Sequence, residues 1–161
     1  MSKHTVYIGL GSNLGDKQEN LRAAIVKIEQ EIGHVAACSS FYETQPEGFV
    51  SNNSFLNGVC CVETDKTPIE ILDISQEIEK QLGRKSKSMN EQYADRTIDI
   101  DLLLYDDLTI SNQRLTLPHP YLHRRGFVIL PFAQIASKVM HPTLRKTIGQ
   151  LRDEFLSGEY R

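Results

Sequence analysis

The stretch DRTIDIDLLLYDD, residues 95 to 107, decides how the rest of the sequence is interpreted. Its apolar run predicts a β-strand, yet Asp99 and Asp101 interrupt that run. Residues two apart in a strand face the same side, about 7 Å apart. The two carboxylates are therefore expected to share one face, while Ile98 and Ile100 face the core. Because leucines at 102–104 are apolar on both faces, the pattern also predicts a central strand.

Two interpretations of the aspartate pair follow from these residues alone. A half-solvated strand often carries acids that face water, and a bare Asp-x-Asp pattern does not exclude this. The second interpretation is metal binding, because two close like charges need a cation or water to relieve their repulsion. Paired carboxylates with open positions suit Mg²⁺, which completes its shell with waters and phosphate oxygens.

Charge is unevenly distributed along the 161 residues. Between Asp107 and Asp153 there is no Asp or Glu, although this interval is rich in Arg, Lys and His. Such asymmetry suits a site that binds metal with one half and an anion with the other. The net charge of -3 argues against nucleic-acid binding, which needs a basic surface.

The order of elements predicts one α+β domain spanning residues 1–161. Its core is expected to be the ferredoxin-like split βαβ plan, βαββαβ, with additional C-terminal strands and helices. Strands are expected at about 4–12, 34–43 and 55–64 and at the aspartate pair, and a hairpin-like turn at Asp106-Asp107. Capping patterns place helices from Asp16 to about Ile32 and from Thr67 to Gly83. Apolar spacing adds helices at 127–137 and around Leu151.

Other features exclude some classes of protein. The glycines of GLGSNLG miss the Rossmann spacing, so we interpret them as a tight strand-to-helix turn. The three cysteines lack metal-ligand spacing. Cys60 and Cys61 are adjacent in an expected strand and point to opposite faces, so we expect them to be small core residues in a reducing compartment. No signal-peptide core and no run of membrane-spanning length is present in the sequence. We therefore expect a cytoplasmic protein with neither a membrane nor a nucleic-acid partner.

Taken together, several motifs resemble one known family. In order, they are GLGSNLGD, FYETQPEG, FLNGV, DRTIDIDLLLY and RLTLPHPYLHRRGFVILP. The chain resembles the 6-hydroxymethyl-7,8-dihydropterin pyrophosphokinases of folate biosynthesis over nearly its whole length. The resemblance implies transfer of pyrophosphate from ATP to the pterin hydroxymethyl group, with release of AMP. It also implies two Mg²⁺ ions brought with ATP.

The resemblance also implies roles for individual residues. The metal ligands would be Asp99 and Asp101, and the catalytic residues Arg84, Arg96 and His119. ATP would be bound by Gln76, Glu79, Leu102, Arg114, Thr116 and Arg125. The pterin would be bound by Thr44, Pro46, Gly48, Phe55, Asn57, Tyr93 and Phe127. In relatives, an Arg-Trp-Gly-Pro run often stands where this chain has residues 92–95, so Tyr93 would cover the pterin with less area than Trp.

These roles agree with the chemistry of the side chains. A flat pterin ring can stack between Phe55 and Phe127, and the Asn57 amide offers a donor and an acceptor to its edge. Two alternatives stay open from the residues alone. One is a non-catalytic ferredoxin-like module that binds a small molecule or a nucleotide, since this fold hosts many functions. The other is an ordinary kinase that releases ADP. We expect a monomer in each case.

Overall fold

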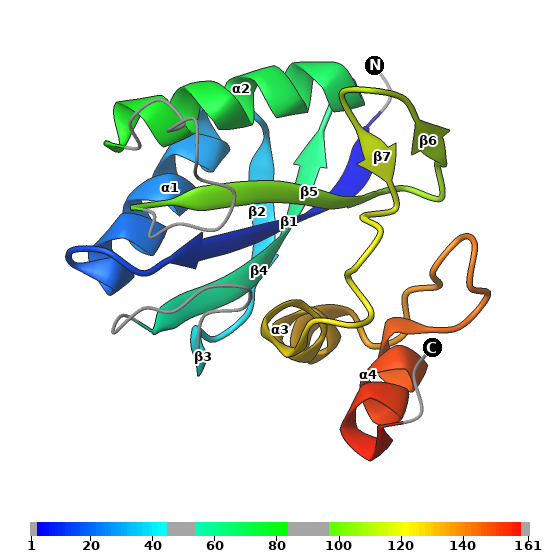
Figure 1. Cartoon of the computed structure of the whole chain (residues 1–161). Coiled ribbons are helices and arrows are strands. Elements are labelled where there is room, and N and C mark those ends of the chain that lie inside the picture. The colour runs from blue at the N-terminus through cyan, green and yellow to red at the C-terminus, as the bar shows by residue number, and fades with distance from the viewer. Residues whose placement is uncertain (1–2, 45–53, 84–96, 159–161) are drawn as a thin grey trace.

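The computed structural model describes residues 3–44, 54–83 and 97–158, and its centre is an antiparallel β-sheet (Figure 1). The strands lie in the order β2-β4-β1-β5, and β3 also pairs with β4. Every pair is antiparallel, with β4 and β5 on either side of β1. The bounds are β1 His4–Ser12, β2 His34–Cys38, β3 Tyr42–Thr44, β4 Phe55–Thr64 and β5 Asp99–Tyr105. This arrangement confirms the α+β, ferredoxin-like prediction.

Two helices cover one face of the sheet, namely α1 (Lys17–Glu31) and α2 (Pro68–Gln81). Both begin where the sequence predicts. Asp16 accepts a hydrogen bond from the Glu19 N–H at α1, and Thr67 forms a capping box at α2. Their apolar sides bury residues such as Ile28 against β1.

The other face of the sheet packs against the C-terminal part of the chain. Helix α3 (Gly126–Ala136) contributes Phe132, and α4 (Ile148–Ser157) packs on α3 (Figure 1). Two short strands, β6 (Ile110–Ser111) and β7 (Thr116–Leu117), pair with each other. No helix within the described ranges is long and apolar enough to cross a membrane.

The expectation that the aspartate-bearing strand is central is wrong, because β5 lies at the end of the strand order. Its leucines are apolar on both faces because helices cover both faces. A register shift opposite Tyr7/Ile8 places Leu102 in the core beside α2, and Leu103 and Leu104 in the core beside α3. Part of the outer edge is covered by α2, because Glu79 accepts the Ile100 N–H at 2.8 Å.

Three smaller expectations also need correction. The strand expected at 34–43 is broken between β2 and β3, where the Ser39 hydroxyl accepts the Val59 N–H at 3.0 Å. The turn after β5 does not close a hairpin onto β5, because β6 pairs with β7. In GLGSNLG, Gly9 and Gly11 lie within β1, and only Gly15 takes the positive φ of a turn.

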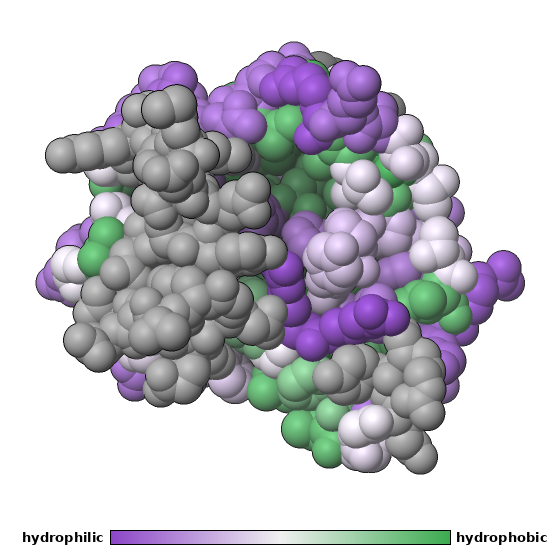
Figure 2. Space-filling model, in the orientation of Figure 1, coloured by the Kyte–Doolittle hydropathy of each residue, from purple (hydrophilic) through white to green (hydrophobic). Residues whose placement is uncertain are grey.

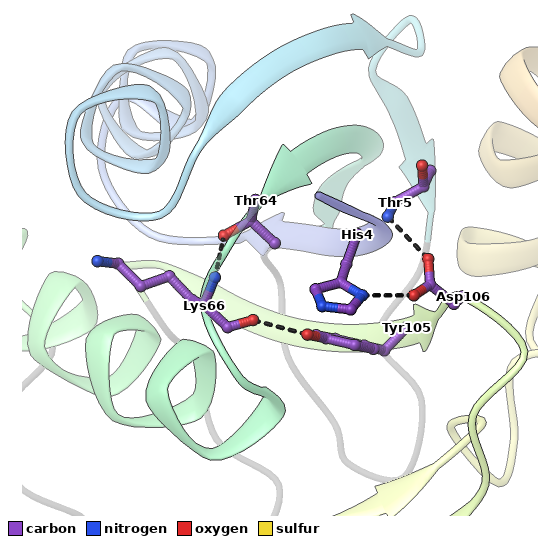
Figure 3. Close-up of polar contacts among 6 residues, drawn as sticks. All are labelled: His4, Thr5, Thr64, Lys66, Tyr105 and Asp106. Atoms are coloured by element: carbon purple, nitrogen blue, oxygen red, sulfur yellow. Dashed lines mark hydrogen bonds and ion pairs between the residues drawn. The ribbon is translucent and has the colours of Figure 1, made fainter. Parts of the chain in front are cut away.

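Polar contacts hold the C-terminal end of β5 against β1 and the start of α2 (Figure 3). Asp106 accepts the Thr5 N–H at 2.9 Å and contacts His4 Nδ1 at 2.7 Å, which ties the end of β5 to the start of β1. The Tyr105 hydroxyl donates to the Lys66 carbonyl, immediately before the α2 cap. These contacts fix β5 between β1 and α2.

Candidate active site

A pocket on the α3 side of the sheet gathers residues from five parts of the fold. Six of the residues named from the sequence line it, from β4, β5, the segment after β7, and the start of α3: Asn57, Asp99, Asp101, His119, Arg125 and Phe127. The glycines of β1 line it as well. Apart from this pocket, Figure 2 shows a hollow beneath the position of α2, with hydrophobic residues on its floor and hydrophilic residues on its upper rim.

Strand register explains why these side chains meet. Gly11 of β1 lies opposite Asn57 on one side and Asp99 on the other, and Gly9 lies opposite Asp101. Directly opposed residues point to the same face of a sheet. The amide on β4 and the carboxylates on β5 therefore face one space across a strand whose two glycines leave that space open.

His119 is held by its backbone and by one ring nitrogen. Its N–H donates to the Leu103 carbonyl at 2.9 Å, and its Nδ1 accepts the Tyr121 N–H at 3.3 Å. Burial, and to a lesser degree the Arg125 charge, lower the pKa of His119, while Asp99 acts in the opposite direction; the net result is a pKa of about 4. At neutral pH the ring is thus uncharged, and because Nδ1 accepts, Nε2 carries the proton.

Arg125 stands where the segment after β7 enters α3. It is the N-cap residue of that helix, and its guanidinium lies over two aromatic rings. The distances to the ring centroids are 5.1 Å for Tyr121 and 5.7 Å for Phe127. Cation–π contacts of this kind orient an arginine without neutralising its charge.

The remaining residues named for ATP lie around α2, outside the pocket that holds the carboxylates. Arg114 pairs with Asp73 of α2 at 2.5 Å, and Leu102 is buried in the core beside α2. Glu79 is also buried, and it accepts the N–H of Ile100. The list is completed by Gln76, exposed on α2, and Thr116, in β7.

A second and larger cavity adjoins the pocket, with a volume of about 380 Å³. Thr116 and His119 line it together with Pro118 and His141. His119 lines both spaces, so the segment after β7 forms the wall between them.

The pterin residues named from the sequence are described only in part. Phe55 lies beside Gly11, and Thr44 pairs with Phe55 across β3 and β4. Phe127 and Asn57 line the pocket. Pro46, Gly48 and Tyr93 lie outside the described residues, and so do the two arginines named as catalytic, Arg84 and Arg96.

The two carboxylates supply hard oxygen donors of the kind that Mg²⁺ takes. Within residues 3–44, 54–83 and 97–158, no group of three or more His, Cys, Asp or Glu side chains could hold a metal. A metal held here would thus use two protein carboxylates and fill its remaining positions with water or substrate oxygens. The donor set fits Mg²⁺ that arrives with a polyphosphate.

Gly9 and Gly11 were not recognised from the sequence as part of the site. A signal was present, since two glycines two residues apart in a strand indicate that something approaches the backbone on one face. Only the register showed that this face is the one bearing Asp99.

An acidic pair, a neutral histidine and an oriented arginine around one pocket are typical of enzymes that transfer phosphoryl groups from nucleotides. Comparison with known proteins agrees. Residues 7–137 match the family described as 7,8-dihydro-6-hydroxymethylpterin-pyrophosphokinase (HPPK). The chain therefore belongs to the 7,8-dihydro-6-hydroxymethylpterin-pyrophosphokinase family, which confirms the resemblance found in its motifs.

Individual relatives support this membership. The chain is 43% identical over 138 residues to 2-amino-4-hydroxy-6-hydroxymethyldihydropteridine pyrophosphokinase of Porphyromonas gingivalis, covering 85% of this chain and 93% of the relative. It is 38% identical over 150 residues to the enzyme of that name from Aquifex aeolicus, covering 93% and 91%.

Solved structures share the fold. An HPPK-DHPS in complex with substrates superposes with a TM-score of 0.79 at 14% identity, covering 98% of this chain and 44% of that one. The chain thus spans less than half of that solved protein. An HPPK-DHPS triple mutant from Plasmodium falciparum gives 0.78 at 18% identity, covering 97% of this chain and 45% of that one.

Proposed function

We propose that the chain transfers pyrophosphate from ATP to the hydroxymethyl group of 6-hydroxymethyl-7,8-dihydropterin, giving the pterin diphosphate and AMP in folate biosynthesis. Family membership supports the pyrophosphokinase activity. The observation that carries the proposal is the pocket itself. Carboxylates, a neutral histidine and an arginine face the same space as the Asn57 amide and the Phe127 ring.

Mg²⁺ is part of this proposal. Asp99 and Asp101 would hold it, and it would neutralise charge on the ATP phosphates and lower the pKa of the attacking hydroxyl. Two ions per active site are expected, both entering with ATP.

The pterin half of the pocket has to bind and orient a planar ring. Asn57 is 6% exposed, so its amide is largely shielded from water and would donate and accept at the pterin edge. Phe127, and Phe55 beside Gly11, offer apolar ring surface for stacking. Thr44, Pro46, Gly48 and Tyr93 complete the proposed pterin site.

The nucleotide half has to place the β-phosphorus in line with the hydroxyl. Neutral His119 would donate from Nε2 to a phosphate oxygen, and Arg125 would balance the charge that develops there. Arg84 and Arg96 are proposed to act on the same phosphates. The nucleoside would lie towards α2 and β7, near Gln76, Glu79, Leu102, Arg114 and Thr116.

The test is to identify the nucleotide product after incubation with ATP, Mg²⁺ and the hydroxymethyl pterin. Phosphorus NMR should find AMP and the pterin diphosphate in equal amounts. ADP with a pterin monophosphate would instead indicate attack at the γ-phosphorus by an ordinary kinase. Tight binding of pterin without any turnover would favour the non-catalytic module.

Three further properties are proposed with the activity. The chain is proposed to act as one domain, as a monomer and in the cytoplasm. Sedimentation equilibrium with saturating ATP analogue and pterin checks that the chain is a monomer. The mass of a single chain is expected, and a mass that doubles on addition of substrates would contradict it.

A further inference from the structure

Gly11 lies at the point where the pterin side of the pocket meets the phosphate side. On β4 its neighbour is Asn57, and on β5 its neighbour is Asp99. Neighbouring strands lie about 4.8 Å apart, so the amide and the carboxylate stand on strands about 9.6 Å apart with Gly11 between them. Any side chain at this position would point into the space that separates them.

The side chains of Asn57 and Phe55 border the space above Gly11. A Cβ built there would lie 2.7 Å from Asn57 Nδ2 and 3.6 Å from Phe55 Cδ1. The first distance is shorter than real Cβ contacts, whereas the second is ordinary van der Waals contact. Asn57 Nδ2 lies 3.5 Å from the Leu10 carbonyl, so the amide extends over β1 next to this glycine.

We propose that Gly11 is a positioning residue that acts through Asn57. By lacking a Cβ, it lets the amide lie over β1 at the height where it meets the pterin edge. It also keeps open the space through which the substrate's hydroxymethyl group reaches the phosphate side. The proposal rests on the proposed function for its substrate, but the placement of the amide is a property of the chain alone.

The substitution Gly11→Ala tests this placement at little cost to folding. The atom that the new methyl meets is the end of a flexible side chain, which can rotate away. The Kd for the hydroxymethyl pterin should rise about tenfold, the loss expected when one buried hydrogen bond is misplaced. The KM for ATP should change far less. An equal loss of affinity for both substrates would point to general damage and would overturn the proposal.

Two comparisons sharpen the test. Gly9→Ala adds a methyl to the same face of the same strand, but that methyl meets Leu103 Cδ1 at 3.4 Å rather than the Asn57 amide. It should weaken pterin binding less than Gly11→Ala does. Adding Gly11→Ala to an Asn57→Ala variant should then cost little more, because the residue through which Gly11 acts is gone. Additive losses would contradict the proposal.

A measurement without substrate separates this inference from the proposed function. In NMR spectra of the free protein, the side-chain amide of Asn57 should shift in Gly11→Ala and stay in place in Gly9→Ala. An unmoved amide in Gly11→Ala overturns the positioning role whatever the substrate is. A moved amide in a protein that binds no pterin would overturn the proposed function instead.

A separate observation carries a second inference, at Cys38 and Cys60. These residues lie directly opposite each other on β2 and β4, and their sulfurs are 3.0 Å apart. Cys38 is exposed on an edge strand, while Cys60 is buried. The hydrogen bond between the two thiols lowers the pKa of Cys38 and raises that of Cys60. An oxidant therefore meets the more acidic thiol first.

We infer that this pair forms a reversible disulfide with a small disulfide such as oxidised glutathione as the oxidant. The Cys38 thiolate attacks the oxidant and forms a mixed disulfide, releasing one glutathione thiol. Cys60 then loses its proton and attacks the Cys38 sulfur, releasing the second glutathione. Both cysteines are oxidised and one glutathione disulfide is reduced to two thiols, so the electrons balance.

Intact mass spectrometry of the whole chain tests this chemistry. Treatment with oxidised glutathione should lower the mass by about 2 Da, and dithiothreitol should restore it. Peptide mapping should link Cys38 to Cys60. In Cys38→Ser this loss should vanish, and in Cys61→Ser it should persist, because Cys61 points to the other face of β4. A stable glutathione adduct without the link, or a link to Cys61, would overturn the inference.

Discussion

Two histidines with lowered pKa values make the stability of this chain sensitive to acid. Burial lowers the pKa of His119 and of His141 to about 4 in each case. At neutral pH both rings are uncharged in the folded and the unfolded chain, so no difference arises there. As the pH falls below about 6.5, the unfolded chain binds protons that the folded chain refuses, and stability falls until about pH 4.

His141 lies outside the active site, so its replacement tests the pH dependence of stability without removing a proposed catalytic residue. His141 Nδ1 accepts the N–H of Leu144 at 3.0 Å, and an asparagine oxygen can take that place. In His141→Asn, the slope of the unfolding free energy between pH 4 and 6.5 should decrease by up to about 1.4 kcal/mol per pH unit. Urea unfolding at several pH values measures it, and parallel curves for variant and wild type would contradict the assignment.

Site residues with reactive or charged side chains were predicted from the sequence. Site residues whose role depends only on which residues lie beside them in the fold were not. Asp99 and His119 stand in motifs that the family resemblance recognises, and the structure brings them into one pocket. Gly11 carries no chemistry of its own. Its part in the site depends on Asn57, which is far away in the sequence and opposite it in the sheet. Cross-strand register of this kind is not local information.

At the scale of elements, the aspartate-bearing strand depends on helix α2. The Ile100 N–H points to the outer edge of β5, between Asp99 and Asp101, and Glu79 accepts it at 2.8 Å. Glu79 is 8% exposed, so this carboxylate is shielded from water. The contact fixes the backbone that carries both proposed metal ligands.

Replacing Glu79 should therefore affect both folding and the metal site. Glu79→Ala leaves the Ile100 N–H without this acceptor and should cost about 1–3 kcal/mol of unfolding free energy. The Mg²⁺ concentration needed for half-maximal activity should rise as well. Glu79→Gln keeps an acceptor oxygen and should recover most of the stability. If Glu79→Ala lost only ATP affinity at unchanged stability, direct nucleotide binding would explain the residue instead.

Helix starts were predicted well because their signals are local. Asp16 and Thr67 cap α1 and α2 as expected, since a cap depends on residues three positions away. The place of β5 in the sheet was predicted wrongly. Leucines on both faces report that both faces are covered, and they carry no information about whether the outer edge has a partner strand.

At the scale of the whole molecule, one sheet separates two hydrophobic cores. Ile78 of α2 belongs to the core under α1 and α2, and Phe132 of α3 belongs to the core on the opposite face. Both side chains are fully buried. Because β1 and β5 contribute to both cores, neither core is expected to persist without the other.

The chain should consequently unfold as one cooperative unit. Ile78→Ala and Phe132→Ala should each lower the unfolding free energy by about 2–5 kcal/mol, and each should move a single transition to lower denaturant. Circular dichroism and tyrosine fluorescence measure the two variants. Two separate transitions, of which each variant shifts only one, would show two independent domains.

The central claim is that Asp99 and Asp101 hold the metal that accompanies ATP at this pocket. Its most direct test counts Mn²⁺ by electron paramagnetic resonance in the presence of α,β-methylene-ATP, which resists cleavage at the β-phosphorus. Wild type should bind two Mn²⁺ per chain with the nucleotide, and Asp99→Asn and Asp101→Asn should each bind fewer, or bind them at least about tenfold more weakly. Unchanged number and affinity in both variants would contradict the account.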